Sequence, residues 1–114
     1  MANVLLINVE TQSVGNLVVS NNEDILDAIG NGATSCDMYK LPNGDYLVYD
    51  MQGFFQPPVG GFVHNQMNWL LMSNACVIGY DPQTAQISDC VSNEIDTLNN
   101  VTYYDATYCA EAQK

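Results

Sequence analysis

The hydrophobic and polar positions of the first 30 residues predict two strands followed by a helix. Residues Val4–Val9 are rich in Val, Leu and Ile, as a buried strand is, and Asn16–Ser20 predicts its partner strand. In the stretch SNNEDILDAIGNG, Ile25, Leu26 and Ile29 share one helical face, with Asn residues before them and Gly residues after them. Asn and Gly are typical caps at those two ends, so we expect a helix here.

The next pattern is that of a β-hairpin. The stretch SCDMYKLPNGDYLVYD has two arms of alternating residues on either side of Asn43-Gly44, the pair that favours a type I′ turn. We therefore expect strands, and no helix, between Met38 and Asp50. Pro57 cannot donate to a sheet, so the second arm should end before it.

A helix is predicted from His64 to Ser73, where no Gly or Pro interrupts the chain. Three apolar residues recur there at helical spacing: Met67, Leu70 and Leu71. Trp69 lies at the edge of this face, so we expect a partly buried indole, with the loop Gln56–Gly61 folded over it and His64 capping nearby. The alternative is that Trp69 faces a partner or a ligand.

Three further elements complete the prediction. The stretches ACVIGYD and TAQIS predict a strand and its return strand, and VSNEIDTLNN predicts a short helix with Val91, Ile95 and Leu98 turned inward. Residues 101–114 suit either a last helix or a last strand. Together these elements indicate an α+β fold, a mostly antiparallel sheet with two or three helices packed on one face. The 114 residues suit a single domain, with a core of residues 1–88 and a C-terminal extension, 89–114, packed on it.

The charge of the chain excludes several kinds of partner. The chain has thirteen acidic residues, two basic residues (Lys40 and Lys114) and no Arg, so its net charge is -11. Direct binding to nucleic acid and docking to an anionic membrane both depend on basic residues, so neither is expected. A host protein with a basic surface would instead be attracted. The acids are scattered, and whether they imitate nucleic-acid phosphates or only solvate the surface is left open by the sequence.

The four cysteines indicate the redox state of the protein. They are widely spaced, and no Cys-x-x-Cys motif suggests a zinc or redox site: Cys36, Cys76, Cys90 and Cys109. The N-terminus shows neither a positively charged region nor a cleavage site, so we expect the host cytoplasm and reduced, mostly buried thiols. Two disulfides are the alternative.

Candidate chemistry is sparse. His64 is the only histidine and a general-base candidate, although such a residue more often caps a helix or bonds the backbone. No motif marks a nucleophile, a metal site or a cofactor, so we expect no enzyme and no cofactor. Tyrosines suit either an interface or the outer face of a sheet. The candidate binding residues are aromatic or lie beside the proline-bearing loop: Phe54, Phe55, Gln56, His64, Asn65, Trp69, Tyr103 and Tyr104.

The order of these features is similar to that of one family. The segments ILDAIGNG, MYKLPNGDYLVYD, QPPVGGFVHNQMN and ACVIGYD together resemble domain of unknown function 3846, small proteins mostly encoded by phages and plasmids. The likeness covers Val4 to Ser88, and Asn65 matches the family's loop asparagine. It implies an accessory protein of a mobile element and brings no catalytic residues with it.

Three functions agree with these observations. The first is a non-enzymatic accessory protein that binds a host protein, such as a defence or nucleic-acid enzyme, through an acidic, tyrosine-rich surface. The second is an oligomeric domain that binds a small molecule or nucleotide near residues 53–69. The third is a component of a virion or another assembly.

Overall fold

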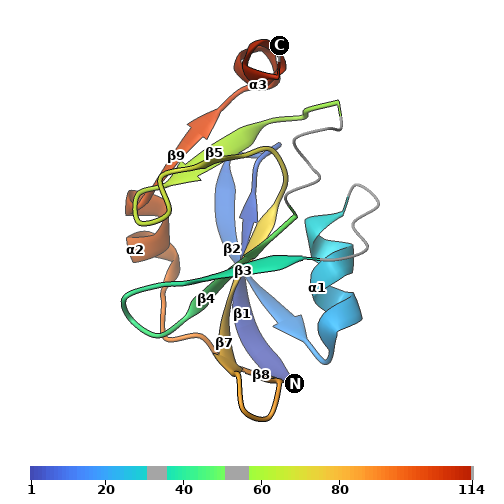
Figure 1. Ribbon diagram of the computed structural model, residues 1–114, viewed down its shortest axis with the longest axis vertical. Coiled ribbons are helices and arrows are strands. Elements are labelled where there is room, and N and C mark those ends of the chain that lie inside the picture. Colours follow the sequence, from blue (N-terminus) through green and yellow to red (C-terminus); the bar gives the residue numbers. More distant parts are fainter. Residues whose placement is uncertain (31–35, 51–56, 114) are drawn as a thin grey trace.

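Two antiparallel sheets and three helices make up the part of the chain that the computed structural model describes, residues 1–30, 36–50 and 57–113 (Figure 1). The α+β class and the mostly antiparallel pairing are confirmed. The strands are β1 (Ala2–Asn8), β2 (Ser13–Val19), β3 (Asp37–Lys40), β4 (Tyr46–Tyr49), β5 (Gly61–His64), β6 (Leu70–Leu71), β7 (Ala75–Asp81), β8 (Gln86–Ser88) and β9 (Val101–Tyr104), and the helices are α1 (Asn22–Ile29), α2 (Glu94–Asn99) and α3 (Ala106–Ala112).

The larger sheet has the strand order β2-β1-β7-β4-β3, with β8 paired to β7. Successive side chains of a strand point to opposite faces, so each strand contributes to two cores. Val4 and Ile78 lie on the face covered by α1, where they meet Ile25. Leu5 and Val77 lie on the other face. Burial on both faces explains why the strand segments are continuous apolar runs and alternate poorly.

A second sheet, of order β6-β5-β9, covers that other face. Phe62 of β5 and Leu71 of β6 are buried there against Leu5 and Leu47. The sequence analysis expected the helices to share one face, but α1 and α2 lie on opposite sides of the larger sheet (Figure 1). The physical reason is that α2 leads directly into β9, a strand of the three-stranded sheet, and is therefore held on the side of that sheet.

Several predicted elements are confirmed by the structure. They are the strand pair β1–β2, the helix α1, the β3–β4 hairpin and the strands β7 and β8. Helix α1 starts after Asn21, whose side chain accepts a hydrogen bond from the amide of Asp24, and it ends at Gly30, whose φ is 72°. These two residues supply the caps that the sequence predicts.

The turn of the β3–β4 hairpin differs from the predicted type I′ turn. Asn43 does not adopt a positive φ, whereas Gly44 does, at 95°. The amide of Gly44 donates to the carbonyl of Leu41, and the amide of Leu41 donates to the carbonyl of Asp45. This is a turn of type I closed by a glycine bulge, and Pro42 suits its second position because proline presets the required φ.

The predicted helix from His64 to Ser73 is wrong. This segment is a hairpin, in which β5 pairs with β6 through Phe62–Leu71 and Val63–Leu70. The amide of Asn68 closes the turn by donating to the carbonyl of His64, and Asn68 has a φ of 56°. A left-handed residue ends a helical turn after one cycle, so the helical spacing in the sequence came from a turn and not from a helix.

The predicted helix after Cys90 exists, but its orientation was predicted wrongly. In α2, Thr97 is the buried residue. The three apolar side chains that were expected to point inward are exposed: Val91, Ile95 and Leu98. The tail beyond it forms both a strand and a helix, because β9 pairs with β5 along its length before α3 begins.

Two further findings concern membrane-spanning helices and the cysteines. Within residues 1–30, 36–50 and 57–113, no helix has the length and apolar character needed to cross a bilayer. All four cysteines belong to this part of the chain and are free, with Cys76 and Cys109 buried.

Gly61 allows α3 to pack against β5. A Cβ at this position would lie 2.7 Å from the Sγ of Cys109 and 2.9 Å from the backbone oxygen of Leu71. We predict that Gly61→Ala lowers the free energy of unfolding by about 1–3 kcal/mol, the usual cost of overpacking. The matched control is Gly15→Ala, because nothing lies within 4 Å of a Cβ there. Equal urea denaturation midpoints for the two variants would contradict the packing of α3.

Candidate functional site

The C-terminal segment is attached to the β3–β4 hairpin by the buried carboxylate of Asp45. This side chain is 2% exposed and accepts hydrogen bonds from the amides of Val91 and Ser92, at 3.0 and 2.8 Å, and from the hydroxyl of Ser92. The side-chain amide of Asn43 also donates to that hydroxyl. A carboxylate removed from water needs such partners, so residues 91 and 92 are held close to the hairpin.

Polar contacts also hold the rest of α2. The side-chain amide of Asn16 in β2 donates to Oε1 of Glu94 at 2.6 Å. The carbonyl of Asn100 accepts a hydrogen bond of 2.8 Å from the amide of Asn65 in the β5–β6 turn. Figure 1 shows this turn beside α2. The helix is therefore fixed near both ends by polar groups, and its attachment does not require its apolar side chains.

The apolar side chains of this region point outward: Ile95 and Leu98 lie on α2, and Val91 lies three residues before its start. Val91 is 72% exposed, Ile95 is 74% exposed and Leu98 is 47% exposed. Single exposed apolar residues are normal on a protein surface, but a group of them on a short helix and in the residues just before it is typical of a contact surface. We call these three residues the α2 face.

A hollow of about 500 Å³ lies beside the α2 face, between α2 and β2. Its lining combines one apolar residue with amides, a hydroxyl and two carboxylates: Asn16, Ser92, Asn93, Glu94, Ile95 and Asp96. Residues 89–113 contain five acids and no Lys or Arg, so no basic side chain of this segment neutralises the carboxylates. The hollow suits a positively charged group that has an apolar stem.

His64 lies at the other side of α2, in a second and more polar hollow of about 210 Å³. It shares this hollow with Gln66, Asp96 and Asn100, and it is only 4% exposed. Its Nδ1 accepts a hydrogen bond of 3.2 Å from the amide of Gln66, which places the proton of the neutral ring on Nε2. Burial lowers the pKa of His64 below 6.5.

The hollow around His64 offers no free nucleophile among the described residues. The residues around it in this hollow include no Cys, and the Ser92 hydroxyl donates to Asp45. In the described ranges, moreover, no three His, Cys, Asp or Glu side chains gather in a group that could hold a metal ion. The bond from Gln66 gives His64 a structural role in the tight β5–β6 turn.

The structure separates the candidate binding residues that the sequence singled out. Asn65 is exposed in the β5–β6 turn and contacts α2 through its amide. Trp69 follows this turn and is 55% exposed, so the prediction that it lies at the edge of a buried helix is wrong. Phe54, Phe55 and Gln56 lie outside the described residues.

The two adjacent tyrosines have different environments. Tyr103 faces the core between the sheets, where its hydroxyl donates to the carbonyl of Ser13 at 2.8 Å, and burial raises its pKa. Tyr104 stacks on Tyr108, with ring centroids 4.4 Å apart. Tyr108 is 52% exposed. Of this pair, Tyr104 therefore belongs to an aromatic contact with α3, whereas Tyr103 links the second sheet to the larger sheet.

The residues of the α2 face were named by the sequence analysis but not as site residues. Their helical spacing was recognised, and the direction in which they point was not. One signal in the sequence could have indicated their exposure. Residues 93–100 contain only two large apolar side chains, Ile95 and Leu98, which are too few to anchor a helix in a core.

Comparison with known proteins adds no assignment. No family model matches this chain, and neither a curated protein nor a solved structure is significantly similar to it.

Burial of His64 makes the stability of the protein depend on pH. Because the folded-state pKa is below 6.5, the unfolded chain binds the proton first as the pH falls, so this stabilisation is present above pH 6.5 and is lost below it. We predict that the free energy of unfolding falls between about pH 7 and about pH 5, and that His64→Asn, which keeps an acceptor near Nδ1, removes part of this fall. Urea denaturation across this range measures it, and identical pH profiles for both proteins would contradict the burial of a neutral histidine.

Proposed function

We propose that this protein acts by binding another protein, one with a basic surface, and that the α2 face and the acidic hollow beside it form the contact. The outward orientation of Val91, Ile95 and Leu98 is the observation that supports this proposal most strongly. Apolar side chains on a helix that is held by other contacts are available to a partner. Their burial in a complex would release ordered water, as at other protein interfaces.

The charge around this face defines the chemistry of the partner. Glu94 and Asp96 line the hollow, and Ile95 lies between them in the sequence. A Lys or Arg of the partner can lay its aliphatic stem along Ile95 and direct its cation to either carboxylate. The net charge of -11 adds long-range attraction, which increases the association rate at low salt.

The proposed biological setting rests on the resemblance to domain of unknown function 3846. A mobile-element accessory protein without catalytic machinery acts by occupying a host protein, and a basic surface on that host protein is typical of a nucleic-acid enzyme or a defence protein. On this proposal the acidic chain occupies a surface that otherwise binds phosphates. The protein itself catalyses no reaction and binds no nucleic acid directly.

The proposal is tested by affinity capture from a lysate of the host, followed by binding measurements on the captured partner. We predict a basic partner, and we predict that Ile95→Ser weakens its binding by about tenfold or more, the loss expected for one well-buried anchor residue. The matched control is Val18→Ser, because Val18 is 53% exposed on β2 and lies outside the hollow.

Salt provides a second measurement on the same complex. Glu94→Gln removes one charge of the hollow and keeps an oxygen that can accept from Asn16, so it should reduce the salt dependence of binding while folding is unchanged. A partner that binds Ile95→Ser and wild-type protein equally well would overturn the assignment of the interface to α2. A captured partner without a basic surface would overturn the proposed chemistry.

A further inference from the structure

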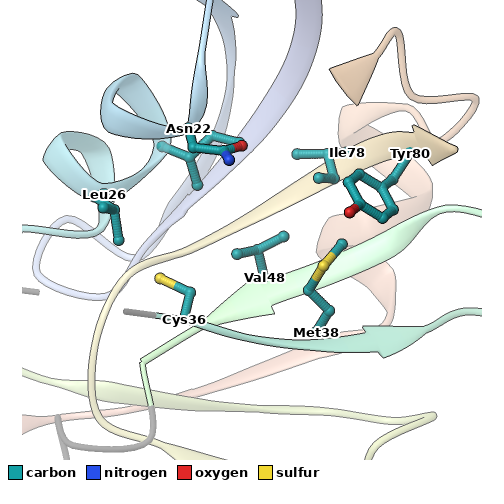
Figure 2. A pocket seen from close by; sticks show the side chains of 8 residues that line it. Asn22, Leu26, Cys36, Met38, Val48, Ile78 and Tyr80 are labelled. Atoms are coloured by element: carbon teal, nitrogen blue, oxygen red, sulfur yellow. The ribbon is translucent and has the colours of Figure 1, made fainter. Parts of the chain in front are cut away.

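A cavity of about 250 Å³ lies between α1 and the larger sheet, on the side of the molecule opposite α2 (Figures 1 and 2). Its lining comes from α1, β4, β7 and the start of β3: Asn22, Ile25, Leu26, Cys36, Met38, Val48, Ile78 and Tyr80. None of these residues belongs to segment 53–69, where the alternative small-molecule function placed its pocket. The cavity is also independent of the α2 face.

The floor of the cavity is rigid and apolar. Val48 and Ile78 are 5% and 2% exposed, and they belong to neighbouring strands of the sheet, since β4 pairs with β7. Ile25, which is 4% exposed, completes the floor from α1. Figure 2 shows Leu26 on α1 and Met38 on β3 on opposite sides of the central space above Val48. A space with a packed floor and walls on two elements is preformed, and preformed apolar spaces bind small molecules.

The polar groups of the lining are uncharged. The Asn22 amide and the Tyr80 hydroxyl both point toward the central space in Figure 2. The ring of Tyr80 is held by an edge contact with Tyr46, with centroids 5.5 Å apart. In a chain with thirteen acids, none of the eight lining residues is acidic or basic. This lining offers one or two hydrogen bonds and no ion pair.

Cys36 adds a further constraint on the ligand. Burial, followed by the nearby carboxylates of Asp50 and Asp37, raises the pKa of its thiol to about 11. The thiol is therefore neutral at physiological pH and behaves as a soft apolar group and not as a nucleophile. The two carboxylates that raise this pKa also repel an anion that approaches this end of the cavity.

We propose that this cavity is a binding site for a small, neutral, single-ring molecule with one hydrogen-bonding group, such as a simple phenol. An apolar cavity of about 150 Å³ in another protein is large enough to bind benzene, so about 250 Å³ accommodates one ring with short substituents. The ring lies on Val48 and Ile78, and its polar group bonds to the Asn22 amide or the Tyr80 hydroxyl. The ligand is released unchanged, because no reactive group lines the cavity.

The site is tested by titrating the full chain with p-cresol and following the methyl resonances by NMR. We expect saturable shifts of the methyl groups of Ile25, Val48 and Ile78, and none of the methyl group of Ile95. Benzoate, which has the same ring but a negative charge, should bind about tenfold more weakly or not at all. The absence of saturable shifts with p-cresol, or equal binding of benzoate, would overturn the proposal.

Two variants fill the cavity from opposite walls, so that the test remains possible if one of them does not fold. Leu26→Trp acts from α1 and Met38→Trp acts from β3, and each should weaken p-cresol binding by about tenfold. Both positions are partly exposed, so a larger ring can enter the cavity without replacing a core residue. The matched control is Val18→Trp, an exposed position on the opposite edge strand, which should bind p-cresol as wild-type protein does. Unchanged binding by a folded filling variant would overturn the proposed site.

Discussion

The buried carboxylate of Asp45 determines where the last quarter of the chain lies. It accepts hydrogen bonds from the two amides and the one hydroxyl of residues 91 and 92, and it is almost completely removed from water. If this segment moved away, the carboxylate would lose these hydrogen bonds, and a hydrogen bond to a charged group contributes about 1.5–3 kcal/mol. The start of α2 is therefore fixed by a polar contact with a hairpin that is about 45 residues distant in sequence.

This constraint explains both the position of α2 and its unusual exposure. Asp45 holds residues 91 and 92 just before α2, Asn16 holds its first residue, Glu94, and Asn65 bonds to its C-cap, so α2 does not need an apolar face to attach to the domain. The apolar residues of the α2 face are consequently outside. The same segment continues into β9, which completes the second sheet, so the residues that form the proposed interface and the residues that close the core are linked in one short stretch.

The larger sheet separates the two proposed sites. One face is covered by the second sheet, which buries Phe62 and Leu71 against it, and α2 leads into β9 of that sheet. The other face is covered by α1, whose eight residues leave a cavity above Val48 and Ile78. A helix of this length covers only part of that face of the sheet. The cavity beside it is therefore a consequence of the architecture. Binding at one site and binding at the other therefore use different surfaces.

Local signals in the sequence were sufficient for about half of this fold. The Asn and Gly caps of α1, the apolar runs of β1 and β7 and the turn residues at Asn43-Gly44 act within a few positions, and these elements were predicted correctly. The strands β5 and β6 were missed because a single left-handed residue, Asn68, interrupts a pattern of helical spacing. Asn tolerates the left-handed conformation better than most residues, but this tolerance does not by itself mark the position of a turn.

The candidate site was less predictable than the fold. The exposure of Ile95 depends on contacts of α2 with Asp45, Asn16 and Asn65, all distant in sequence, and no periodicity within the helix contains that information. Asp45 itself looks in the sequence like an ordinary hairpin residue after Asn-Gly. The same limit applies to the cavity, because its eight lining residues come from four separate elements and meet only in the folded chain.

The most direct test of this account is the solvent accessibility of the α2 face in the isolated protein. Paramagnetic relaxation of methyl groups by a neutral gadolinium chelate measures it without interference from the charge of the chain. The account predicts that the methyl signals of Val91, Ile95 and Leu98 broaden as strongly as that of Val18 and far more than that of Ile78. Methyl groups of Val91, Ile95 and Leu98 that are as protected as Ile78 would contradict it, because α2 would then be packed by its apolar residues and not held by Asp45.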